Sequence, residues 1–150
     1  MSLLSNKNSA IISSCLIGIN CRYNGKNCLS EYLNVYMEKY NLIPVCPEQL
    51  GGLSTPRLKS EIKNGNGFDV VEGKAKVLNE KDIDITENFI KGANEVLKIC
   101  KILKVNIAFF KEKSPSCGVR KIYNNGKLCD GCGVTTALLL KNNIKVFGIE

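Results

Sequence analysis

The chain has 150 residues, of which 44% are hydrophobic and 23% charged, a balance that predicts one globular domain spanning residues 1–150. It contains no histidine, which excludes a histidine general base, a Ser-His-Asp triad and any His-ligated zinc or iron. The net charge of +7 suits anionic partners, but the lysines are scattered and do not predict binding of long nucleic acids. The apolar runs are too short to span a membrane.

Short apolar runs alternate along the chain with segments of helical periodicity. In chain order we expect a strand at 10–15, a helix at 29–40, a strand at 42–46, a loop at 51–57, a hairpin or irregular excursion at 68–80, a helix at 86–104 capped by Thr86, a strand at 105–111, a tight turn at 124–126, a helix at 135–141 and a strand at 144–149. The alternation predicts an α/β fold with a mostly parallel open sheet and helices on both faces, Rossmann-like or flavodoxin-like. It leaves the strand order open.

Eight cysteines are available for chemistry, at positions 15, 21, 28, 46, 100, 117, 129 and 132. Residues 1–14 lack the apolar core of a secretory signal, and a domain of this length does not need disulfide bonds for stability. We therefore expect a cytoplasmic protein with reduced thiols. In such a protein, a group of cysteines indicates metal binding or catalysis.

Three cysteines follow strands that we expect to be parallel. Cys15 and Cys46 are separated by about the length of one β-α-β unit, and Cys117 follows the strand at 105–111 after a short loop. Open α/β sheets bind ligands at the carboxyl edge of their strands, so these three thiolates could meet at one polynuclear metal centre. Packing in the core is the alternative interpretation of each cysteine.

Residues beside these cysteines add to the pattern. Pro47 and Pro115 hold the neighbouring backbone extended, and Glu48, Ser114 and Ser116 lie within a few positions of a thiol. A carboxylate and two hydroxyls beside a metal would serve water activation and substrate orientation. A helix cap for Glu48 and local turn hydrogen bonds for the serines are the structural alternatives.

Four segments together resemble the motifs of the thiouracil desulfurase family: CLIGINCRYNG (15–25), VCPEQLGGLSTPR (45–57), KEKSPSCG (111–118) and GCGVTTALL (131–139). The resemblance implies a [4Fe-4S] cluster held by three cysteines, with the fourth iron open to substrate sulfur. By position in the motifs, the ligands would be Cys15, Cys46 and Cys117. Other members of this family can have valine where this chain has Cys21, so Cys21 is left out of the ligand set.

The resemblance also implies a reaction that removes sulfur from a thiolated pyrimidine or nucleoside, such as 2-thiouracil, without net redox change. Glu48 and Ser114 would be the catalytic residues, with Glu48 relaying a proton or activating water. Ser116, Gly52 and Arg57 would contact the substrate; for Gly52 and Arg57, a purely structural loop is the alternative.

Two other functions remain open at this point. One is a non-catalytic zinc- or metal-binding module that uses some of Cys15, Cys21, Cys46 and Cys117. The other is a thiol redox protein, because Cys129 and Cys132 form a CDGC pair with the spacing of a redox dithiol.

Overall fold

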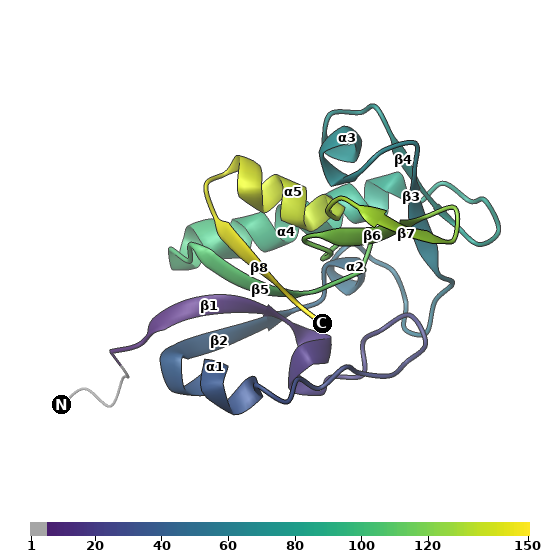
Figure 1. Cartoon of the computed structure of the whole chain (residues 1–150). Coiled ribbons are helices and arrows are strands. Elements are labelled where there is room, and N and C mark those ends of the chain that lie inside the picture. Colours follow the sequence, from purple (N-terminus) through teal and green to yellow (C-terminus); the bar gives the residue numbers. More distant parts are fainter. Residues whose placement is uncertain (1–5) are drawn as a thin grey trace.

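Four parallel strands form the central sheet of the computed structural model, which describes residues 6–150 (Figure 1). The strands, in spatial order, are β2 (Tyr40–Val45), β1 (Asn8–Ser13), β5 (Ile107–Lys111) and β8 (Lys145–Ile149). From β1 the chain proceeds to β2 on one side and later to β5 on the other, so the strand order reverses between β1 and β5. The predicted mostly parallel α/β sheet is confirmed, and the reversal marks the crevice in which such sheets bind ligands.

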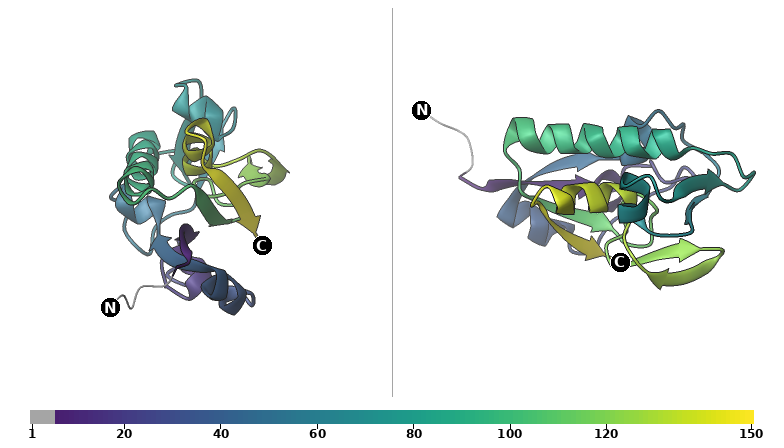
Figure 2. Two further views of the ribbon diagram at one scale, coloured as in Figure 1. Left: turned by 90° about the vertical axis from the view of Figure 1, so that its left-hand side faces the viewer. Right: turned by 90° about the horizontal axis from the view of Figure 1, so that it is seen from above.

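Helices cover both faces of this sheet, as the continuous burial of residues 10–13 of β1 requires. Ile11 packs toward α4 (Thr86–Leu103) and α5 (Val134–Lys141), whereas Ala10 and Ile12 belong to a cluster on the other face. On that second face lies α1 (Leu33–Lys39), which has no fully buried residue. Figure 2 shows α4 and α5 side by side along one face of the sheet. No helix within residues 6–150 is long and apolar enough to cross a membrane.

Two antiparallel hairpins extend the structure beyond the carboxyl edge of the sheet. In the first, β3 (Ser60–Lys63) pairs with β4 (Lys76–Asn79), and α3 (Gly67–Val71) connects them. In the second, β6 (Lys121–Asn124) pairs with β7 (Lys127–Asp130). Asn125 and Gly126 form its turn with φ values of 52° and 76°, so the predicted tight turn is confirmed.

Two local predictions differ from the structure. The helix expected at 29–40 begins only at Leu33, because Ser30 Oγ accepts a hydrogen bond from the Tyr32 amide and holds a turn there. Thr86 does not cap α4 through its side chain. Asp84 Oδ1 accepts hydrogen bonds from both the Thr86 amide and its hydroxyl, and the Thr86 hydroxyl accepts a bond from the Val77 amide.

The excursion expected at 68–80 contains α3 and β4, and the partner of β4 was not predicted. β3 is only four residues long and has a single fully buried side chain, Ile62, so alternation along the sequence is too short to identify it. Two further short elements hold site residues: the 3-10 helix η1 (Ser14–Ile17) and α2 (Pro47–Leu50).

Candidate active site

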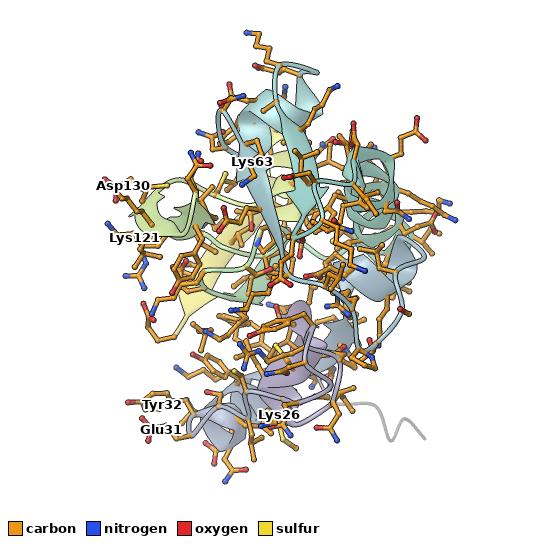
Figure 3. All side chains as sticks on the ribbon, turned by 90° about the vertical axis from the view of Figure 1, so that its right-hand side faces the viewer. Lys26, Glu31, Tyr32, Lys63, Lys121 and Asp130 are labelled. Atoms are coloured by element: carbon orange, nitrogen blue, oxygen red, sulfur yellow. The ribbon has the colours of Figure 1, made fainter. Side chains whose placement is uncertain are left out.

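A cleft of about 450 Å³ opens at the carboxyl edge of the sheet, where the ends of β1 and β5 meet. Cys15, Cys46 and Cys117 all line it. In Figure 3, which faces the side of the molecule toward which these strands run, Lys63 on β3 and Lys26 in the segment after η1 lie far apart above and below the strand ends. The residues that line the cleft come from segments that are distant in the sequence, at 13–23, 45–61 and 111–126.

Each predicted ligand occupies the first turn or loop after its strand. Cys15 is in η1 just after β1, Cys46 follows the last residue of β2 and is the N-cap of α2, and Cys117 is in the loop after β5. Cys15 and Cys117 are buried, and Cys46 is half-buried. The structure thus brings the three side chains to one cleft, although their positions in the sequence span more than half of the chain.

Cys21 also lines the cleft, which the sequence analysis did not predict. Its side chain is hydrogen-bonded to those of Cys15 and Cys46, and its carbonyl oxygen lies 3.7 Å from Cys46 Sγ. Gly18, with φ at 97°, reverses the chain after η1 and returns the segment toward Cys15. The sequence signal for a second thiol near Cys15 was the glycine, Gly18, that stands midway between Cys15 and Cys21.

The surroundings of Cys21, Cys46 and Cys117 raise the pKa of each thiol and so favour its neutral form. The hydrogen bond to Cys15 is the largest cause that raises the pKa of Cys21 to about 11. The hydrogen bond to Cys21, then burial, raises the pKa of Cys46 well above its usual range, and burial does the same for the pKa of Cys117. Since metals bind thiolates, loading a metal here requires these thiols to release protons.

Glu48 extends from α2 beside Cys46. Its Oε1 lies 3.9 Å from Cys46 Sγ, and its Oε2 lies 3.7 Å from Arg57 Nη2. Arg57 also donates from Nη2 to the Cys21 carbonyl at 3.0 Å and from Nη1 to Thr55 Oγ1 at 3.1 Å. With side chains only 13% and 11% exposed, Glu48 and Arg57 form a partly desolvated ion pair in the wall of the cleft.

The serines of the SPSC segment have two different environments. Ser114 lines the cleft, and its Oγ accepts hydrogen bonds from the Ser116 and Cys117 amides. Ser116 is 1% exposed and does not line the cleft; its hydroxyl lies 3.1 Å from Ser114 Oγ and donates to Cys117 Sγ at 3.5 Å. Ser13 is a second hydroxyl partner of Cys117, and sequence reasoning did not identify it.

Gly52, like Ser116, lies outside the cleft. Its amide donates to the Gln49 carbonyl, and its φ of 90° suits the turn that follows α2. Of the three residues expected to contact substrate, only Arg57 lines the cleft. Gly52 and Ser116 instead shape the segments around Cys46 and Cys117.

Glu112 was also missed, and it organises the loop that carries Cys117. Its carboxylate accepts hydrogen bonds from the amides of Val119, Arg120 and Lys121 and from Arg120 Nε at 2.8 Å. The side chain is completely buried. A charged residue directly after a strand gave no indication of burial, because its partners are backbone groups of a loop.

The donor set fits a cluster better than a single ion. Among residues 6–150, no three Cys, Asp or Glu side chains converge closely enough to hold one metal ion, so nothing in this part of the chain favours the zinc module. An iron–sulfur cluster binds each thiolate through a different iron atom and so needs ligands that are further apart. The thiols of Cys15, Cys46 and Cys117, which come from three different segments and line one open cleft, are suitable ligands for such a cluster.

The CDGC pair lies away from this cleft. The Cys129 thiol donates to the Ile122 carbonyl, and burial raises the pKa of Cys132 to about 11. A redox dithiol needs a thiol whose pKa is lowered, so this environment does not favour the thiol redox protein.

Comparison with known proteins agrees with this geometry. The model of the 2-thiouracil desulfurase family matches residues 10–150. The chain belongs to the 2-thiouracil desulfurase family. The resemblance carried by the four sequence motifs is thereby confirmed.

Two relatives of this desulfurase cover nearly its whole length. "Uncharacterized protein YbbK" of Bacillus subtilis (strain 168) is 42% identical over 139 residues, which are 91% of this chain and 92% of YbbK. The solved structure of the [4Fe-4S]-dependent thiouracil desulfidase TudS (DUF523Vcz) is 36% identical and superposes with a TM-score of 0.82, covering 95% of this chain and 91% of that one. The family model and the solved structure therefore each match nearly the whole chain.

Proposed function

We propose that this desulfurase removes sulfur from a thiolated pyrimidine, such as 2-thiouracil or its nucleoside, at a [4Fe-4S] cluster held by Cys15, Cys46 and Cys117. The observation that carries the proposal is the meeting of these three thiols in one cleft of about 450 Å³. When bound, the cluster supplies a thiophilic iron without a protein ligand, which polarises the C=S bond of the substrate. The volume of the cleft favours a small molecule over a long nucleic acid as substrate.

The overall reaction exchanges sulfur for oxygen. A water molecule attacks the thiocarbonyl carbon, the carbon–sulfur bond breaks, and sulfide leaves, with no change in oxidation state. Glu48 would accept the proton of the attacking water, since the chain has no histidine to do so. Arg57, 3.7 Å from Glu48, would hold this carboxylate at the wall of the cleft.

Ser114 would orient the substrate from the loop after β5. Its Oγ accepts two amide hydrogen bonds, and because the Ser116 hydroxyl donates to Cys117, the Ser114 hydroxyl donates to Ser116 Oγ. Rotation of the Ser114 hydroxyl would transfer this hydrogen bond to a ring oxygen or nitrogen of the bound pyrimidine. Ser116 would act on Cys117 through its hydroxyl rather than on the substrate.

We further propose one desulfurase domain over residues 1–150. We also propose a cytoplasmic location, which the eight free cysteines support.

The test begins with anaerobic reconstitution, which should load about four iron atoms per chain. The loaded protein should then release sulfide from 2-thiouracil. Cys117→Ala should lower the iron content and abolish sulfide release. A wild-type protein that takes up no iron, or that carries the cluster but leaves 2-thiouracil unchanged, would contradict the proposal.

Glu48→Gln tests the proton-transfer role separately from cluster binding. We expect kcat to fall by about 10²–10⁴-fold while iron content stays at the wild-type level, because the amide cannot accept the proton. Glu61→Gln is the matched control, since Glu61 also lines the cleft but pairs with Lys63 on β3. Equal kcat values for Glu48→Gln and wild type would exclude Glu48 as the base.

A further inference from the structure

Cys21 is a fourth thiol in the proposed cluster site. It is 3% exposed, lines the cleft, and its side chain is hydrogen-bonded to those of two proposed ligands, Cys15 and Cys46. No other part of the proposed function uses it. A thiol at this place is close enough to the ligands to affect the metal that they hold.

The backbone around Cys21 is held by residues of the same site. Arg57 Nη2 donates to the Cys21 carbonyl at 3.0 Å, and the Cys21 amide donates to the Ile19 carbonyl at 2.9 Å. Arg57 also pairs with Glu48, so one guanidinium links Cys21 to the proposed base. The position of the thiol is therefore fixed by the structure around the cleft.

A fourth cysteine raises a chemical conflict. The proposed reaction needs an iron without a protein ligand, whereas a thiolate beside an open iron is a strong ligand for it. Cys28 provides the contrast within the same segment, because it is half-buried and does not line the cleft. The conflict is removed if Cys21 binds only while substrate is absent.

We propose that Cys21 is an exchangeable fourth ligand of the cluster, which binds the substrate-accessible iron in the resting enzyme and is displaced by substrate sulfur. This inference rests on the proposed function. In the exchange, the iron–sulfur bond to Cys21 breaks and a bond to the thiocarbonyl sulfur forms, with no change in oxidation state. The released thiolate takes one proton from water in the cleft.

Such a ligand has two opposite effects. It protects the exposed iron from loss, and it competes with substrate for the same coordination position. The apparent affinity for substrate is reduced by the fraction of enzyme in which Cys21 is bound. Removing the thiol should therefore make the cluster more labile and substrate binding tighter.

The experiment compares wild type, Cys21→Val and the matched control Cys28→Val, all reconstituted anaerobically. The loaded proteins are treated with ferricyanide, and conversion of [4Fe-4S] to [3Fe-4S] is followed by electron paramagnetic resonance. Cys21→Val should lose the fourth iron at least about tenfold faster than wild type, and Cys28→Val should lose it at the wild-type rate. Cys21→Ser serves as a second variant in case the valine disturbs folding.

Binding of 2-thiouracil is then measured in a Glu48→Gln background, where turnover is slow. Adding Cys21→Val should lower the Kd several-fold. Faster iron loss together with a lower Kd supports the exchangeable ligand. Unchanged iron loss, or faster loss together with weaker binding, overturns it, because a purely structural residue would weaken both properties. Wild-type protein that loads a cluster and desulfurates thiouracil supports the proposed function, whichever result the Cys21 variants give.

Discussion

At the scale of single residues, Glu112 shows how a buried charge supports the cluster site. Burial by itself raises the pKa of this carboxyl, but the hydrogen bonds from Arg120, Val119 and Lys121 outweigh burial and lower the pKa below its usual value. The ionised carboxylate therefore stabilises the folded loop that carries Cys117. This stabilisation is complete above the pKa of the unfolded chain, about 4.3, and is lost as the pH falls through the lower pKa of the folded protein.

Glu112→Ala should lower the free energy of unfolding by roughly 2–3 kcal/mol at pH 7, because the loop amides lose their acceptor. Urea unfolding measures this change. Below about pH 4 the difference from wild type should shrink, since the wild-type carboxyl is then becoming protonated. Glu150→Ala is the control, because Glu150 pairs with Arg120 from an exposed position. A difference that is constant with pH would show that the charge of Glu112 does not matter.

At the scale of elements, the contact between α2 and α4 positions Cys46 and Glu48. The two helices touch through glycine: a Cβ on Gly92 would lie 2.0 Å from the Pro47 carbonyl oxygen, and a Cβ on Gly51 would lie 2.0 Å from that of Asn88. The Asn88 side chain also donates to the Gly51 carbonyl at 2.9 Å. α4, the strongest helix signal in the sequence, is thus the support for the four-residue α2.

Gly92→Ala should destabilise the protein by about 1–3 kcal/mol, although alanine is the better helix former, because the added methyl displaces the backbone of α2. Iron content after reconstitution should fall as well, since Cys46 is the N-cap of that helix. Asn94→Ala, on an exposed position of α4, should be neutral or slightly stabilising. Thermal unfolding and iron analysis test both variants, and a stabilised Gly92→Ala with full iron content would contradict the packing argument.

At the scale of the whole molecule, the cleft connects parts of the chain that the sheet alone leaves separate. Glu61 on β3 accepts a hydrogen bond from the Gly126 amide in the turn of the other hairpin, and Arg57, in the loop after α2, donates to the Cys21 carbonyl in the segment after η1. A cluster held by Cys15, Cys46 and Cys117 would add further links between these regions. Loading should therefore stabilise the folded state as a ligand does.

We expect reconstitution to raise the Tm by about 5–10 °C relative to the cluster-free protein, as measured anaerobically by circular dichroism. Cys117→Ser, treated with the same iron and sulfide, should show a much smaller rise because one ligand is lost. An equal rise in both proteins would mean that iron binds elsewhere on the chain.

The sequence by itself determined the elements with a strong local pattern and the three cysteines that follow strands. β1, β5, α4, α5 and β8 were predicted near their observed bounds, because a buried strand or an amphipathic helix is encoded by neighbouring residues. Only the tertiary structure decided the strand order, the pairing of β3 with β4, the place of Cys21 beside Cys46 and the burial of Glu112. Those features depend on contacts beyond the range of local periodicity, whether with loop amides seven to nine positions away, as for Glu112, or with another strand or loop, and such contacts leave no periodic signal in the residues that make them.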